Sequence, residues 1–181
     1  MKELFERVKN ILFNPLESWQ KIKEEQEDIK TFLTSYVLIL SAIIPLAQFF
    51  GFVIFGRIFG IRINFFRGLL GLIISYFVQI TGIILASFVM SQLSVTLNYK
   101  KDFMAHFKLI CYSLTPYWIL GIFYLIPPIW LVSLIGALYS IYLIFLGADK
   151  IIEISREKTF IYIIILVIIL FIIYFVINLL I

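Results

Sequence analysis

Few side chains in this sequence could do chemistry, and their spacing does not bring them together. The chain has one histidine, His106, and one cysteine, Cys111. On a helix two residues at this spacing point about 140° apart, so they cannot form a nucleophile and its base. Intramembrane proteolysis would need paired aspartates, a serine with a histidine, or a zinc motif. We therefore expect no enzyme activity, no catalytic residue, no cofactor and no metal site.

Both side chains have simple structural interpretations. Cys111 lies in a hydrophobic run, and a single cysteine cannot close an intramolecular disulfide, so it is interpreted as a small apolar filler. His106 stands at the edge of the same run, where a lone imidazole is typical of an interfacial polar residue rather than of a ligand.

Three arginines are the remaining candidates for binding chemistry. Arg57, Arg62 and Arg67 occur in residues 56–68, a segment with no acidic residue and with phenylalanines and isoleucines between the arginines. Guanidinium groups bind phosphate through paired hydrogen bonds. We interpret the segment as an interfacial loop whose arginines contact lipid phosphates, with a dedicated anion site as the alternative.

The amino-acid composition indicates that these residues belong to a membrane protein. Of the 181 residues 62% are hydrophobic and 14% are charged, which indicates an integral membrane protein and excludes a water-soluble fold. The net charge is +4, but the basic residues are spread over the segments that flank the apolar runs. We therefore expect no nucleic-acid binding.

The longest uncharged run predicts a transmembrane helical hairpin. Between Lys108 and Asp149 lie 40 uncharged residues, and Pro127 and Pro128 divide them into 18 before and 20 after. At about 1.5 Å per residue, each half spans a hydrocarbon core of about 30 Å. Proline interrupts the helical hydrogen-bond ladder, so the pair predicts a tight turn at the far membrane surface.

The whole chain is predicted to be all-α: a polytopic membrane helical bundle of five transmembrane helices, preceded by N-terminal amphipathic interfacial helices. Residues 1–30 form a cytoplasmic arm and residues 31–181 the transmembrane domain. The five spans are predicted at residues 31–54, 69–93, 106–126, 128–147 and 159–181. Asp102 is the expected N-cap of the third span.

Two short amphipathic helices are predicted in the arm. Apolar residues recur at helical spacing in residues 2–13, and Asn14 with Pro15 indicates a second helix start. Trp19 lies beside Lys21 and Lys23 and is interpreted as an interfacial anchor in the headgroup region. A docking face for a cytoplasmic partner is the alternative.

Small residues and prolines predict how the spans pack. Gly136 and Ser140 stand four residues apart in the fourth span and predict a close helix contact, which would make this helix the most enclosed one. Pro45 and Pro116 predict kinks in the first and third spans. Gln79, in the second span, is expected to hydrogen-bond to another helix because it would be costly against lipid.

Charge asymmetry predicts the orientation. With five spans, 12 of the lysines and arginines fall on the side of the N-terminus and three on the other side. Basic residues concentrate in cytoplasmic segments, so we expect a multi-pass protein of the cell membrane with its N-terminus in the cytoplasm and Ile181 outside.

A set of prolines, glycines and tyrosines is spaced as in a known family. The set comprises Tyr112, Thr115, Pro116, Pro127, Gly136, Tyr139, Ser140 and Gly147, with Asn14 and Pro15 ahead of Trp19. Over most of the chain it resembles the YIP (Ypt/Rab-interacting protein) family. The resemblance implies five spans and a cytoplasmic N-terminus. Eukaryotic members of that family reside in the endoplasmic reticulum and Golgi, associate with prenylated Rab GTPases and take part in vesicle traffic.

This sequence also departs from the eukaryotic members. It lacks their long polar N-terminal region and has Asn98 and Tyr99 where relatives often place glycines. These departures point to a prokaryotic branch of the family.

The expected function is that of a non-enzymatic membrane scaffold or adaptor that acts through helix packing. The expected partners are membrane lipids and a protein in a membrane or transporter complex, with a homo-oligomer left open. The alternative is a transporter or channel for a neutral small molecule or lipid, because Pro45 and Pro116 interrupt two spans at loosely corresponding places.

Overall fold

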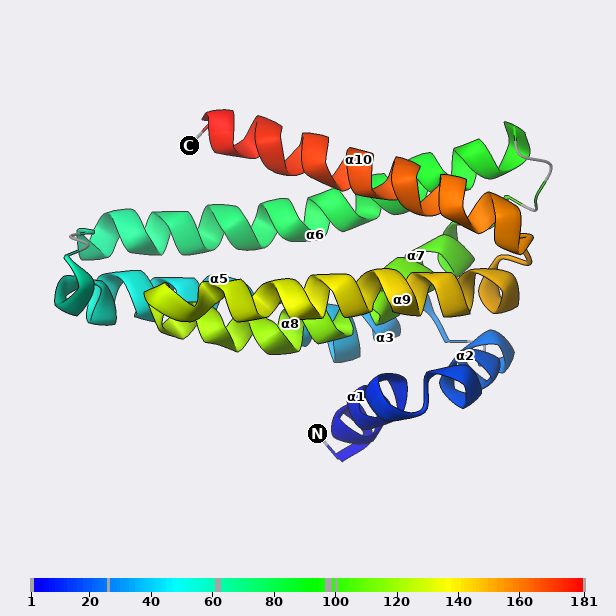
Figure 1. Ribbon diagram of the computed structural model, residues 1–181, viewed down its shortest axis with the longest axis horizontal. Helices are drawn as coiled ribbons and strands as arrows, with labels where there is room; N and C mark the ends of the chain where they lie inside the picture. Colours follow the sequence, from blue (N-terminus) through cyan, green and yellow to red (C-terminus); the bar gives the residue numbers. More distant parts are fainter. Residues whose placement is uncertain (1, 26, 61–62, 97–98, 100, 181) are drawn as a thin grey trace.

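The computed structural model describes residues 2–25, 27–60, 63–96, 99 and 101–180, and every regular element in these ranges is a helix (Figure 1). Arg62, Asn98 and Ile181, which the sequence analysis named, lie outside them. The helices are α1 (Lys2–Phe13), α2 (Pro15–Glu24), α3 (Ile29–Phe32), η1 (Leu33–Val37), α4 (Leu38–Ser41), α5 (Ile43–Phe49), η2 (Phe50–Phe55), η3 (Gly56–Phe59), α6 (Phe65–Thr96), α7 (Phe103–Ser113), α8 (Thr115–Leu120), η4 (Gly121–Leu125), η5 (Pro127–Val132), α9 (Ser133–Ile151) and α10 (Arg156–Leu180).

Four helical segments of the described chain are long and apolar enough to cross a membrane. They are Ile29–Val53, Phe65–Val95, Phe103–Leu125 and Pro127–Ile151. Each overlaps a predicted span, so the prediction of an all-helical, multi-pass membrane protein is confirmed. The fifth predicted span falls on α10, which is one helix of 25 residues.

The long helices lie side by side and reverse direction from one to the next (Figure 1). Helix α10 contacts α6 and α9, and the segment α8–η4 contacts α9 along the hairpin. The arm, α1 and α2, lies on the side of the bundle opposite α10, where α1 contacts α8 and α2 contacts α9 (Figure 1). The arm is therefore part of the packed structure and not a separate appendage.

Both predicted proline kinks coincide with helix interruptions. The first span breaks at a turn at Ala42, three residues before Pro45, and the third breaks at Leu114, two residues before Pro116. Proline has no amide hydrogen to donate to the carbonyl four residues earlier, so the ladder opens at that point.

The turn predicted at Pro127 is also present. Ile126 has extended backbone angles (φ −115°, ψ 99°) between the 3₁₀ helices η4 and η5. The residue before a proline is pushed out of the helical region, and the chain reverses there into the antiparallel hairpin of α7–η4 and η5–α9.

The prediction that the fourth span is the most enclosed is wrong. In an apolar 18-residue stretch of Phe103–Leu125, 56% of the residues are buried, against 28% in such a stretch of Pro127–Ile151. Helix α7 is surrounded by α6, α8 and α9, whereas α9 leaves Leu138 68% exposed on its outer side. Small residues bring α9 close to its neighbours on one face only.

Candidate functional site

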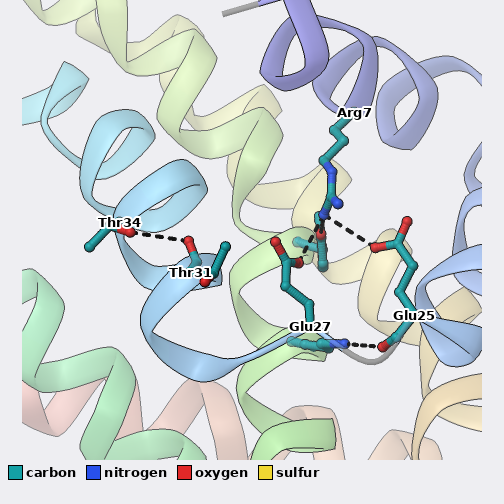
Figure 2. A network of polar contacts seen from close by, with 7 residues as sticks. Arg7, Glu25, Glu27, Thr31 and Thr34 are labelled. Atoms are coloured by element: carbon teal, nitrogen blue, oxygen red, sulfur yellow. Dashed lines mark hydrogen bonds and ion pairs between the residues drawn. The ribbon is translucent and has the colours of Figure 1, made fainter.

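Polar side chains gather where the arm meets the bundle. Arg7 of α1 donates to Glu27 Oε2 at 3.0 Å and to the hydroxyl of Tyr112 on α7 at 2.7 Å. Its Nη1 atom is also 3.2 Å from Glu25 Oε2. Figure 2 shows the guanidinium of Arg7 between the two carboxylates. One arginine thus connects α1, the linker after α2 and the third span.

The charges of this cluster compensate one another. Burial lowers the pKa of Arg7, but the interactions with Tyr112, Glu25 and Glu27 outweigh this effect, so that its pKa is raised and the guanidinium stays charged. The Lys108 side chain, which is buried, donates to the backbone carbonyl of Glu25 at 2.7 Å. A cation at the start of the third span therefore fixes the linker as well.

Trp19 is enclosed by protein, which corrects its interpretation as an anchor in the headgroup region. Its ring is fully buried and lies edge-on to Tyr112, with ring centroids 6.3 Å apart. A Cβ atom added to Gly147 of α9 would be 2.6 Å from Trp19 Cε2 and 2.7 Å from Leu109 Cδ1. The indole therefore occupies space that only a glycine leaves open.

Two further contacts hold the arm along α9. Tyr139 donates to the carbonyl of Leu12, near the end of α1, at 2.7 Å. Lys23 pairs with Glu153 at 2.7 Å, but both side chains are largely exposed, so this pair contributes little stability. We call the whole contact the arm-docking site; it comprises Arg7, Leu12, Trp19, Lys23, Glu25 and Glu27 of the arm and its linker, and Lys108, Tyr112, Tyr139, Gly147 and Glu153 of the bundle.

The hairpin contact predicted at Gly136 is present. A Cβ atom there would lie 2.6 Å from the Pro116 carbonyl oxygen and 2.9 Å from Tyr117 Cα, so the two backbones touch. Ser140 is buried and donates to the carbonyl of Gly136 in its own helix at 2.9 Å. Thr115 shares a 2.7 Å hydrogen bond with Tyr36 of the first span.

Gln79 forms hydrogen bonds to two other spans. The expectation that it bonds to another helix is therefore confirmed. Its Nε2 donates to the Ser41 carbonyl at 3.1 Å, and its Oε1 accepts from Trp118 Nε1 at 2.7 Å. The Ser41 carbonyl is the one left without a helical donor by Pro45. The sequence contains both halves of this arrangement, but only the fold brings them together.

His106 is a core residue and not the interfacial one that the sequence suggested. It is fully buried, with Nε2 2.7 Å from Ser94 Oγ and Nδ1 3.0 Å from the Tyr162 hydroxyl. Ser94 also donates to the Met90 carbonyl at 3.1 Å. Its oxygen therefore accepts from Nε2–H, and Tyr162 donates to Nδ1, an arrangement that a neutral imidazole satisfies completely.

The ends of η3 and α6 that carry Arg57 and Arg67 lie at the opposite end of the bundle from the arm (Figure 1). Arg57 is exposed in η3, and Arg67 is exposed in the first turn of α6. Arg62 lies outside the described residues. The structure therefore places two of the three at this end and leaves their contact with lipid phosphates as a prediction.

Little space for a cofactor is found at the arm. A cavity of about 50 Å³ lies between α1 and α2, lined by Arg7, Asn10 and Lys21 among others, and has room for a few waters. Within the described ranges, no three His, Cys, Asp or Glu side chains gather closely enough to hold a metal ion. The arm-docking site is thus a packed contact between elements of one chain.

Comparison with known proteins identifies the family. The Yip1 domain matches residues 9–177, which include the end of α1, all of α2 and nearly all of the bundle. The chain belongs to the Yip1 family. It is similar to the inner membrane protein YohC of Escherichia coli K12, with 28% identity over 160 residues that cover 83% of this chain and 81% of YohC. YohC of E. coli O6:H1 matches equally well. No solved structure gives a significant match.

This membership confirms the resemblance to the family that the sequence motif indicated. The motif residues Tyr112, Pro116, Gly136, Tyr139 and Gly147 all lie within the matched range. In this Yip1-family protein, all five take part in the hairpin contact or in the arm-docking site.

Proposed function

We propose that this Yip1-family protein is a non-enzymatic integral membrane scaffold or adaptor. The observation that carries the proposal is the role of the motif residues in the fold. Tyr112 and Tyr139 donate or accept hydrogen bonds to the arm, Gly147 accommodates Trp19, and Gly136 allows α9 to touch α8. Side chains that hold an arm against a membrane bundle suit a protein that presents a surface to lipids or to a partner.

The proposed topology has five spans, with α10 as the fifth, and two amphipathic arm helices at the cytoplasmic face of the cell membrane. The count of basic residues supports a cytoplasmic N-terminus and an external C-terminus. Single-cysteine labelling in intact cells tests this directly. Lys158→Cys should react only after a membrane-permeant reagent is added, whereas Arg57→Cys should react from outside. Reaction of position 158 with external reagents alone would overturn the topology.

The scaffold proposal is tested by native mass spectrometry of the protein extracted with its own lipids. We expect a stoichiometric protein partner on the wild type that is lost in Gly147→Leu, which displaces the arm. Gly71→Ala is the matched control, because a Cβ atom at Gly71 meets no atom within 4 Å. The partner should be retained in that variant.

A transporter for a neutral molecule or lipid remains the second candidate. It is favoured by the interruptions of the first and third spans next to Pro45 and Pro116, since broken helices are often found at transport sites. If the protein is extracted without a protein partner and carries a small molecule instead, flux in liposomes becomes the test. Flux would replace the scaffold proposal.

A further inference from the structure

We propose that the tip of the arm inserts into the membrane, and that Phe5, Phe13 and Leu16 are its lipid contacts in place of Trp19. The occupant of this surface is phospholipid of the leaflet on the arm's side of the bundle. The inference rests on the membrane topology of the proposed function and identifies which partner the arm contacts.

Contacts between the arm and α9 set the depth of the tip. Trp19 lies at Gly147 and Lys23 pairs with Glu153, so α2 runs beside α9 in the same direction. Before the start of α2, near the end of α1, the Leu12 carbonyl accepts a hydrogen bond from Tyr139 of α9.

Tyr139 lies well inside the fourth span. It precedes Asp149, the residue that ends the uncharged run, by ten positions. At about 1.5 Å per residue this distance is about 15 Å along the helix, roughly half of a hydrocarbon core. The turn between α1 and α2 is therefore beside a part of α9 that lies within the bilayer.

Exposure distinguishes the lipid side of the arm from its protein side. Ile11 and Trp19 are fully buried against the bundle. Phe5, Phe13 and Leu16 are 70%, 74% and 60% exposed. Large apolar side chains on an outer surface at this depth need an apolar medium, and acyl chains supply it.

The surface of α9 next to the arm continues this apolar surface. Leu138 and Tyr142, on either side of Tyr139, are 68% and 47% exposed on a segment long and apolar enough to span the membrane. A lipid that contacts these two residues is adjacent to the tip. The tip thus extends the lipid-facing surface of the bundle.

Charges next to Phe5 also fit a lipid surface. Lys2 and Lys9 are exposed and stand three residues before and four residues after Phe5, so they flank it on the same side of α1. Lysine stems can lie along acyl chains while the ammonium groups reach lipid phosphates.

Site-directed spin labelling measures this arrangement. Single cysteines are introduced at Phe13 and Leu16 in a Cys111→Ala background. Gln20 and Glu24 are the controls, because they are exposed on the same face of α2 as Leu16 but lie one and two turns farther from the tip. The full chain is reconstituted in vesicles of phosphatidylethanolamine and phosphatidylglycerol. Accessibility to oxygen, which concentrates in the bilayer, is compared with accessibility to a water-soluble nickel chelate.

We expect the oxygen-to-nickel ratio to be at least about tenfold higher at positions 13 and 16 than at positions 20 and 24. Low ratios at all four positions, with the nickel chelate as accessible as oxygen, would place the tip in water and overturn the inference. Labels shielded from both reagents would show that a protein surface, such as a second copy, covers the tip, and would overturn it as well. Because cysteine labelling of position 158 reports the topology independently, a failure here is distinguishable from a failure of the proposed function.

Discussion

Replacing Gly147 by alanine should weaken the docking of the arm without unfolding the bundle. The added Cβ atom would stand 2.6 Å and 2.8 Å from two atoms of the Trp19 ring. An ordinary carbon–carbon contact is about 3.5–4.0 Å, so the ring must move by about 1 Å. Trp19 is fully enclosed and cannot rotate aside, and overpacking of this kind typically costs about 1–3 kcal/mol.

This cost can be compared with the burial of the indole. A fully buried tryptophan removes about 200 Å² from water, which is worth about 5 kcal/mol at about 25 cal/mol per Å². Gly147→Ala should therefore leave the arm docked most of the time, while lowering the ratio of docked to undocked arm by between about fivefold and about 150-fold. Gly147→Leu should displace the arm.

Amide hydrogen exchange in lipid nanodiscs measures the effect. Exchange of the α2 amides should quicken by the same factor in Gly147→Ala, because they exchange from the undocked state, while the amides of α6 should not change. Gly71→Ala serves as the control for inserting a methyl group into a membrane helix. If the α2 amides of Gly147→Ala exchanged within about twofold of the wild-type rate, the arm would not depend on the Trp19–Gly147 contact and the reasoning would be refuted.

Three further substitutions test other contacts. Gly136→Leu should lower the thermal unfolding midpoint in detergent more than Gly147→Ala does, because its side chain meets the backbone of Pro116, which cannot rotate aside; an equal or smaller effect would contradict the backbone contact. Gln79→Leu removes two interhelical hydrogen bonds and should destabilise the bundle by about 1–3 kcal/mol in chemical unfolding, and no loss would argue against its bridging role. Tyr112→Phe removes an acceptor of Arg7 and should speed amide exchange in α1 by about fivefold, for a loss of about 1 kcal/mol, with α6 again as the internal reference.

Hydrophobic run length and proline position were enough to predict most of the fold. The four described spans, the turn at Pro127 and the interruptions next to Pro45 and Pro116 follow from constraints that act within a few residues of the chain. The N-cap of the third span is of the same kind, since the Asp102 carboxylate accepts from the Ala105 amide at 3.0 Å. The family motif could also be recognised in the sequence, because it consists of residue types at fixed local spacings.

The environment of single side chains was decided by tertiary structure. Sequence periodicity shows that Trp19 and His106 lie near charged, interfacial segments, but it cannot show which protein surface covers them. Trp19 is buried because Gly147, 128 residues later, leaves a space for its ring, and His106 is buried because Ser94 and Tyr162 from two other helices satisfy both nitrogens. In a membrane, apolar residues are stable against lipid as well as against protein, so hydrophobicity alone does not tell the two apart. In this chain, close packing and hydrogen bonding between segments far apart in the sequence decide which residues face protein and which face lipid.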